Sequence, residues 1–280
     1  MKKTTKLLTV ILVLGMMMGI FAALGITASA EEGYSGTSVT PPTVNSDNYI
    51  QFGLSADNWN QYDGYYAISN ADELYGFADI VNKRDQSGTG ACAILVNDIV
   101  VNAGTVTSAG SSTGTTYNWT PIAKDFNNDY NYYKGTFDGR GYTISGLYAG
   151  DATAKPVGLF GALGQSGTNA TVKNLTIANS YFTGASSVGA IAGHVQGATI
   201  ANCKIASDVT VSAEDALGGI AGAVAWARMI NITSCVNLGK VVGGETGGRN
   251  VGAILGNAME NSSTYVKISG CYIYCRQHYR

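Results

Sequence analysis

The sequence predicts an all-β protein in which short strands wind into a β-solenoid. Glycine is abundant, with 37 residues in 280, and proline is scarce, with 4; the glycines follow no Gly-X-Y period, which excludes collagen. Charged residues make up 13% of the chain, about half of the usual share of a globular domain. The third observation is a pair of short motifs rich in Val, Ile and Thr that recurs from residue 157 onward, as strands do in a repeat protein.

The charge balance limits the classes of partner. The 17 Lys and Arg residues against 19 Asp and Glu residues give a formal net charge of −2. A domain that binds nucleic acid is usually strongly basic, because it must neutralise phosphates. We therefore expect no nucleic-acid partner.

The first thirty residues have the pattern of a secretory signal peptide. Three lysines precede an apolar run over residues 7–26, and a small-x-small site follows at residues 28–30. We expect residues 1–30 to be cleaved, which leaves a secreted or cell-surface protein with no membrane segment of its own. Because the apolar run is long enough to span a bilayer, an uncleaved anchor is the alternative.

The segment after the signal peptide is expected to lead into the solenoid. Residues 31–47 are rich in Ser, Thr, Gly and Pro, which predicts a disordered leader. Residues 48–92 are assigned to an N-terminal cap region. Its first part, residues 48–66, is rich in Asn, Gln and Tyr and is expected to form a strand or an irregular lead-in segment.

One convincing helix is predicted inside the cap region, over about residues 70–83. Asn70 and Glu73 have the N-cap and N3 pattern that begins a helix. Its apolar face has the spacing i, i+3, i+4, i+7, and consists of Leu74, Phe77, Ala78 and Val81. Because the first coil of a solenoid otherwise exposes its cross-section, we expect this helix to cover it.

Residues 93–275 are assigned to the solenoid, and residues 93–101 are its first strong strand region. A Gly-hydrophobic block occurs four times, at residues 157–161, 188–193, 217–222 and 251–256. A block rich in Val, Ile and Thr follows each of them, at residues 171–177, 199–205, 231–236 and 267–273. Both blocks recur in the same order, so each repeat predicts one coil, with equivalent residues stacked about 4.8 Å apart.

The repeat also predicts which side chains stack. Val188, Leu217 and Val251 hold one repeat position and are expected to stack in a single column. Asn174 and Asn202 hold another and are expected to form a short amide ladder at a turn. Coordinates that place these three residues far apart would exclude the solenoid.

The five cysteines indicate buried thiols more than a metal site. Cys203, Cys235 and Cys271 share one repeat position and are expected to form an interior column of free thiols, since parallel stacking seldom gives good disulfide geometry. Cys271 and Cys275 could be a ligand pair, but no second pair lies at zinc spacing and the chain has only two histidines. We expect no metal and no cofactor.

The first block resembles the GLUG repeat of bacterial surface proteins. Residues 158–161 read Gly-Leu-Phe-Gly, with variants at residues 189–193, 218–222 and 252–256. Residues 119–122 and 135–147 resemble the initial coil that often precedes such repeats. The resemblance covers roughly residues 67–275 and implies a right-handed parallel β-helix. Because this repeat also occurs in the non-catalytic part of some metallopeptidases that cleave immunoglobulin A, it implies an architecture more than an activity.

The acidic residues form no recognisable catalytic set. None of them recurs at matching repeat positions, so stacking builds no row of carboxylates. Asp138 lies in the sequence Phe-Asp-Gly-Arg-Gly, where we interpret it as a turn former. The motifs His-Glu-x-x-His and Gly-x-Ser-x-Gly are absent. We expect no enzymatic activity and assign no catalytic residue.

Four aromatic residues are the candidates for ligand binding: Trp119, Tyr130, Tyr132 and Tyr133. They lie among Asn and Asp residues, and aromatic faces beside amides and carboxylates suit a sugar ring or a peptide. The alternative is that Trp119 belongs to the core and that the tyrosines only cover a long loop.

Two functions remain open. One is an exported structural or adhesion module that presents loops to a host or matrix glycan or protein; the other is a carbohydrate-active β-helix enzyme, or the non-catalytic part of a larger exported enzyme. No finishing helix or polar coil follows Cys275. We expect residues 276–280 to be a truncated tail, and the alternative is end-to-end contact with a partner at the uncapped last coil.

Overall fold

The structure is a computed structural model that describes residues 33–83, 87–124, 132–165, 168–224, 229–244, 249–258 and 265–274. The expected signal peptide over residues 1–30 and the expected tail over residues 276–280 lie outside these residues. Within the described ranges, no helix is both long and apolar enough to cross a bilayer.

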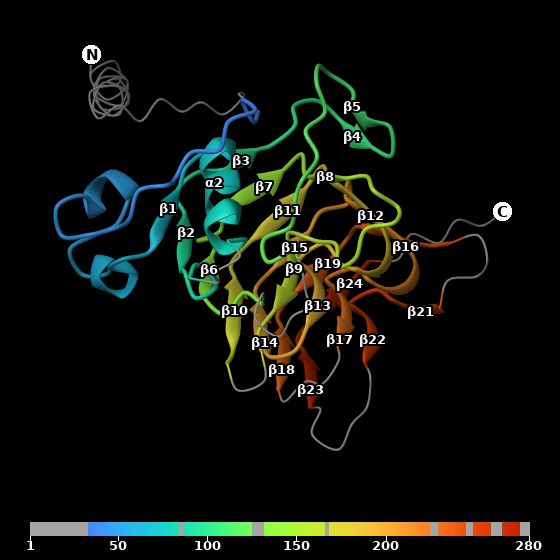
Figure 1. The fold of residues 1–280 in the computed structure, drawn as a ribbon. Coiled ribbons are helices and arrows are strands. Elements are labelled where there is room, and N and C mark those ends of the chain that lie inside the picture. Colours follow the sequence, from blue (N-terminus) through green and yellow to red (C-terminus); the bar gives the residue numbers. More distant parts are fainter. Residues whose placement is uncertain are drawn as a thin grey trace, which may run out of the picture.

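The described strands confirm a parallel β-solenoid of about four turns. Four parallel sheets run along it (Figure 1). Sheet 1 holds β1 (Tyr66–Ile68), β2 (Ala93–Leu95), β6 (Thr136–Asp138), β10 (Ala170–Lys173), β14 (Ala198–Ala201), β18 (Ile230–Thr233) and β23 (Val266–Ser269). Sheet 2 holds β3 (Ile99–Val100), β7 (Thr143–Ser145), β11 (Thr176–Ala178), β15 (Lys204–Ile205), β19 (Val236–Asn237) and β24 (Tyr272–Ile273).

The other two sheets complete each coil. Sheet 3 holds β8 (Tyr148–Ala149), β12 (Tyr181–Val188), β16 (Thr210–Gly218), β20 (Lys240–Gly243) and β21 (Arg249–Gly252). Sheet 4 holds β9 (Phe160–Leu163), β13 (Ala192–Val195), β17 (Ala221–Val224) and β22 (Leu255–Ala258). A small antiparallel hairpin, β4 (Val106–Thr107) with β5 (Gly110–Ser111), projects from an early coil (Figure 1).

The register of the sheets confirms the predicted column of Val188, Leu217 and Val251. Val157 pairs with Val188, Val188 with Leu217, and Leu217 with Val251. The first three of these side chains are buried. Each repeat of the sequence is therefore one coil, and equivalent positions lie on top of one another.

A corner with a left-handed backbone follows the sheet 1 strand of each repeat. The corner residue is Asn174, Asn202, Ser234 and finally Gly270, with φ between 52° and 63°. Asn and Gly tolerate this conformation better than other residues, which explains their recurrence. The predicted amide ladder is confirmed here, because Asn202 Nδ2 donates to Asn174 Oδ1 at 3.2 Å.

The interior contains the predicted thiol column. Cys203 and Cys235 are buried, Cys271 is half-buried, and all three are free thiols. A hydrogen bond between the Cys203 and Cys235 side chains, together with burial, raises the pKa of Cys203 well above its ordinary value. These thiols therefore act as small interior side chains at the position that Leu175 occupies one coil earlier. Cys275 lies outside the described residues.

The capping helix is confirmed as α2 (Ala71–Val81), slightly shorter than expected. Asn70 Oδ1 accepts the Glu73 backbone N–H at 2.9 Å, and Glu73 Oε2 accepts the Ser69 backbone N–H at 2.7 Å. These bonds satisfy donors that the first turn of a helix leaves open. Phe77 on its buried face lies against Phe137 of β6, with ring centroids 6.0 Å apart.

Residues 33–47 do not form the expected disordered leader; they run as an ordered, extended segment over the cap. The Val39 N–H donates to the Asp72 carbonyl, and the Ala67 N–H donates to the Pro42 carbonyl at 2.7 Å. Tyr34 stacks on Tyr75 of α2. Composition predicted disorder because the segment has few apolar residues, but its backbone is held by distant parts of the chain.

Candidate functional site

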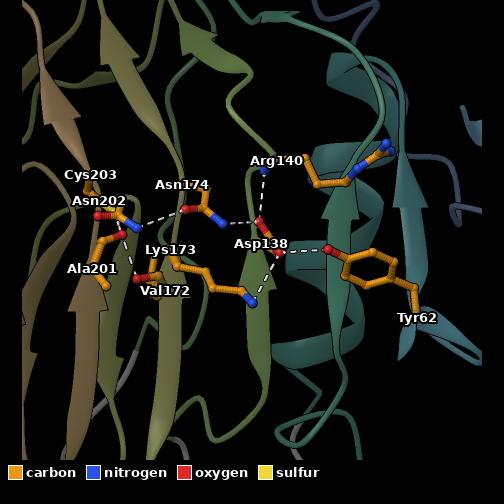
Figure 2. Close-up of polar contacts among 9 residues, drawn as sticks. All are labelled: Tyr62, Asp138, Arg140, Val172, Lys173, Asn174, Ala201, Asn202 and Cys203. Carbon is orange, nitrogen blue, oxygen red and sulfur yellow. Dashed lines mark hydrogen bonds and ion pairs between the residues drawn. The ribbon is translucent and has the colours of Figure 1, made fainter. Parts of the chain in front are cut away.

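A polar network links the cap region to the first coils, and it is centred on Asp138 at the end of β6 (Figure 2). Asp138 is buried, with its side chain 2% exposed. It accepts hydrogen bonds from Tyr62 Oη at 3.0 Å and from Asn174 Nδ2 at 3.0 Å. It also accepts the Arg140 backbone N–H at 2.9 Å and forms an ion pair with Lys173 Nζ at 3.3 Å. Both carboxylate oxygens are therefore engaged within the protein.

The network sets the protonation of this acid. Burial alone would raise the pKa of Asp138, but the hydrogen bonds from Asn174, the Arg140 N–H and Tyr62, with the charge of Lys173, together lower it below its ordinary value. A general acid at neutral pH needs the opposite, a raised pKa. Asp138 is thus an ionised acceptor that organises its neighbours.

The local sequence explains this geometry. Asp138 begins a tight turn in which Arg140 has φ 51° and Gly141 has φ 90°, and the Arg140 N–H returns to the Asp138 side chain. This geometry agrees with the interpretation of Asp138 as a turn former. The turn also aims the guanidinium toward the cap region, where it donates to the carbonyls of Phe52 at 2.9 Å and Gly53 at 3.1 Å.

The cap region contains a tandem motif that the sequence analysis missed. Residues 47–53 read Asp-Asn-Tyr-Ile-Gln-Phe-Gly, and residues 57–64 read Asp-Asn-Trp-Asn-Gln-Tyr-Asp-Gly. Each copy forms a short 3₁₀ helix, η1 (Tyr49–Phe52) and η2 (Trp59–Tyr62). We call residues 47–64 the tandem turns; they project beside β1 (Figure 1).

The two copies have nearly the same local structure. Asn48 and Asn58 have φ of −126° and −131°, and their Oδ1 atoms accept the backbone N–H groups of Asn45 and Ser55. The equivalent rings of Tyr49 and Trp59 stack at 5.3 Å with an angle of 17°. A short repeat of Asp-Asn-aromatic-x-Gln-aromatic was the signal that could have found this pair.

An open depression of about 420 Å³ lies where the tandem turns meet the solenoid. Its lining consists of Tyr62, Asp138, Arg140, Gly141 and Asn174. The tandem turns, which supply Tyr62 to this lining, also carry exposed polar side chains, among them Gln51, Asp57, Asn60 and Gln61. Such amides and carboxylates can exchange hydrogen bonds with a polyhydroxylated ligand.

The predicted aromatic site is not formed by the described residues. Trp119, Tyr132 and Tyr133 are 3%, 2% and 0% exposed, and Tyr130 lies outside the described residues. Trp119 Nε1 donates to the Gly158 carbonyl at 3.1 Å, and Tyr133 stacks on Phe160 at 5.0 Å. Trp119 and Tyr133 belong to the main apolar core, as the alternative expected for Trp119 but not for the tyrosine. Tyr132 is buried beside His194, with ring centroids 5.9 Å apart. Rings that are covered in this way offer no face to a ligand.

Comparison with known proteins gives a distant and partial result. No family model matches the chain. The chain is 40% identical over 92 residues to Halomucin from Haloquadratum walsbyi, a match that covers 33% of this chain and 1% of Halomucin. A crystal structure from Bacteroides ovatus, provisionally named an immunoglobulin A1 protease, has 17% identity over 75% of each chain and a TM-score of 0.41.

Proposed function

We propose that this chain is an exported, non-catalytic adhesion module that binds a glycan on the tandem turns. The observation that carries the proposal is the contrast between two neighbouring groups of side chains. Asp138 and its partners are occupied with one another, whereas the tandem turns beside them expose a set of amides and carboxylates.

The tandem turns suit a sugar better than an extended apolar ligand. Gln51 and Gln61 hold equivalent positions in the two copies, and both are exposed. Amide groups donate and accept at once, which matches the hydroxyls of a sugar. The Tyr49 and Trp59 rings are half-buried, so each retains an edge against which a sugar ring can pack.

The scaffold holds this surface in place before a ligand arrives. The carbonyls of Phe52 and Gly53 are bound by Arg140, and Tyr62 is bound by Asp138. Phe52 and Leu54 form a second apolar cluster with Ile94 of β2. A surface fixed in this way loses little conformational entropy on binding.

Export and surface location are part of the proposal. They are supported by the basic and apolar pattern of residues 1–30, by the resemblance of residues 158–161 to the GLUG repeat of bacterial surface proteins, and by the partial match to Halomucin.

A glycan array probed with residues 31–280 tests this function. We expect binding to a subset of glycans, and we expect the double variant Gln51→Ala/Gln61→Ala to lose it without a change in melting temperature. Thr115→Ala, at another exposed polar residue, is the control and should bind as the wild type does. Unchanged binding by the double variant would exclude the tandem turns as the site. Release of reducing sugar from any bound glycan would instead favour the carbohydrate-active enzyme.

A further inference from the structure

The guanidinium of Arg140 forms no ion pair with an acidic side chain of the described residues. It donates to two neutral carbonyls, those of Phe52 and Gly53, and the ion pair nearby joins Lys173 to Asp138. A guanidinium has five N–H donors and remains charged throughout the physiological pH range. Among the described residues, Arg140 therefore keeps both an unpaired charge and N–H donors for a further partner.

Arg140 lines the depression of about 420 Å³, together with Tyr62, Asp138, Gly141 and Asn174. This volume falls within the range of about 300–1,000 Å³ that is usual for small-molecule sites. In Figure 2 the Arg140 side chain and the Tyr62 ring extend to the same side of Asp138. Burial, followed by the charge of Asp138, raises the pKa of Tyr62, and the charge of Arg140 opposes that rise. The guanidinium therefore acts electrostatically on a group that lines the depression.

The other charges around the depression leave its lining positive. Asp138 is paired with Lys173 at 3.3 Å, so these two opposite charges largely cancel and the charge of Arg140 remains. The tandem turns carry exposed carboxylates of their own, at Asp47, Asp57 and Asp63. None of these three lines the depression, and physiological salt screens exposed charges over about 8 Å. A ligand in the depression therefore meets a net positive charge.

We propose that the depression binds the carboxylate of an acidic sugar through the Arg140 guanidinium. This site rests on the proposed glycan-binding function, and it names the class of sugar that the glycan contains. A planar guanidinium matches a planar carboxylate, and the charge-assisted N–H···O bonds between them are stronger than bonds between neutral groups. Tyr62 belongs both to the tandem turns and to the lining, so the depression and the proposed glycan surface adjoin each other.

Two further groups of the lining suit the hydroxyls of the same sugar. Tyr62 Oη donates to Asp138 at 3.0 Å, and a phenolic oxygen that donates in this way can still accept a hydrogen bond. Asn174 Oδ1 accepts one hydrogen bond from Asn202 and has a second lone pair. Both side chains are half-buried. These acceptors match hydroxyl donors, whereas the carboxylate of the sugar matches Arg140.

Gly141 allows the charge of the depression to be changed by itself. This glycine lines the depression, is exposed and has φ 90°. Apart from its chain neighbours, no heavy atom lies within 4 Å of the place that a Cβ atom would take. Gly141→Asp and Gly141→Asn add side chains of the same shape at similar backbone strain, and they differ by one negative charge. A difference in binding between the two variants therefore reports that charge.

Titration calorimetry of residues 31–280 with matched oligosaccharides tests the proposal. The probes are tetragalacturonate and a hyaluronan tetrasaccharide, each compared with its own methyl ester, which removes the charge and keeps the sugar. We expect at least one acid to bind, its dissociation constant to rise about tenfold or more on esterification, and its binding to weaken as salt is raised. Gly141→Asp should weaken binding of that acid about tenfold, and Gly141→Asn should bind it within about threefold of the wild type.

Several outcomes would overturn the carboxylate site. They are failure of both acids to bind, equal affinity for an acid and its ester, equal effects of the two Gly141 substitutions, or tighter binding of a sulfated κ-carrageenan tetrasaccharide. Arg140→Gln should also weaken binding of the acid; because it frees the carbonyls of Phe52 and Gly53, the Gly141 pair decides if this variant fails to fold. A glycan array that shows only neutral glycans bound would exclude this site and leave the proposed function standing, whereas an array without any bound glycan would exclude both.

Discussion

One column of the interior allows the solenoid to be tested position by position. Val172, Ile200, Ile232 and Ile268 occupy the same register position in successive sheet 1 strands. The first three are fully buried and the last is about half exposed. Ile232→Ala and Ile268→Ala thus remove the same atoms from the same register position. They differ in that β23 stacks over Ile232, whereas Ile268 is about half exposed.

The expected costs differ by a clear margin. Truncating a buried isoleucine to alanine removes its transfer free energy and leaves a cavity, for a loss of about 2–5 kcal/mol. Ile268 keeps roughly half of its surface in water, so it contributes about half of the ~1.5–3 kcal/mol of a fully buried side chain, and its removal opens no closed cavity. We expect about 1 kcal/mol for Ile268→Ala.

Urea unfolding of the wild type and of each variant measures both costs. Ile200→Ala serves as the control for Ile232→Ala, because both positions have a coil on each side. A loss at Ile268 as large as that at Ile232 would refute the reasoning, since it would mean that the Ile268 side chain is as well covered as that of Ile232. Equal and small losses at Ile200 and Ile232 would refute the stacked interior itself.

Three further predictions follow from single contacts. Burial lowers the pKa of His194 to about 4. Because His194 in the unfolded chain binds a proton near pH 6.5, the free energy of unfolding should fall by up to about 3 kcal/mol between pH 6.5 and 4. Urea unfolding across this range should show a smaller pH dependence of stability for His194→Gln than for the wild type. Asp138→Ala leaves Tyr62 and Lys173 without their acceptor and should cost on the order of 3 kcal/mol, with faster proteolysis within residues 48–64 as the specific readout. Gly76→Ala places a methyl group against the Val39 carbonyl and should cost about 1–3 kcal/mol; limited proteolysis should then cut the leader while α2 remains folded by circular dichroism.

The parts of the fold that the sequence predicted are those in which local pattern and global packing coincide. In a solenoid, equivalent residues of successive repeats stack on one another. The repeat spacing of Val188, Leu217 and Val251 was therefore enough to predict that these residues pair. The start of α2 was similarly predictable, because Asn70 and Glu73 interact within one turn. Neither prediction required knowledge of distant contacts.

The errors concern segments whose structure depends on distant partners. The leader is polar, yet its Val39 and Pro42 backbone groups bind α2 and β1. Trp119 was a candidate ligand residue because it lies among polar neighbours in sequence, but its indole N–H reaches a carbonyl 39 positions away. The composition of a segment shows which side chains are neighbours in sequence. It does not show which of them face the interior of a coil.

The N-terminal end of the described solenoid is where we expect its interaction with another molecule. Middle coils satisfy one another through stacking, so their side chains and strand edges are largely occupied. At the N-terminal end, residues 33–83 close the edge of β1 and carry the tandem turns as an exposed polar surface. Among the residues that the structure describes, β22, β23 and β24 each pair with a strand on one side only, and Ile268 and Ile273 are about half exposed. A hydrophilic ligand therefore matches the N-terminal end, where the exposed side chains of the tandem turns are amides and carboxylates.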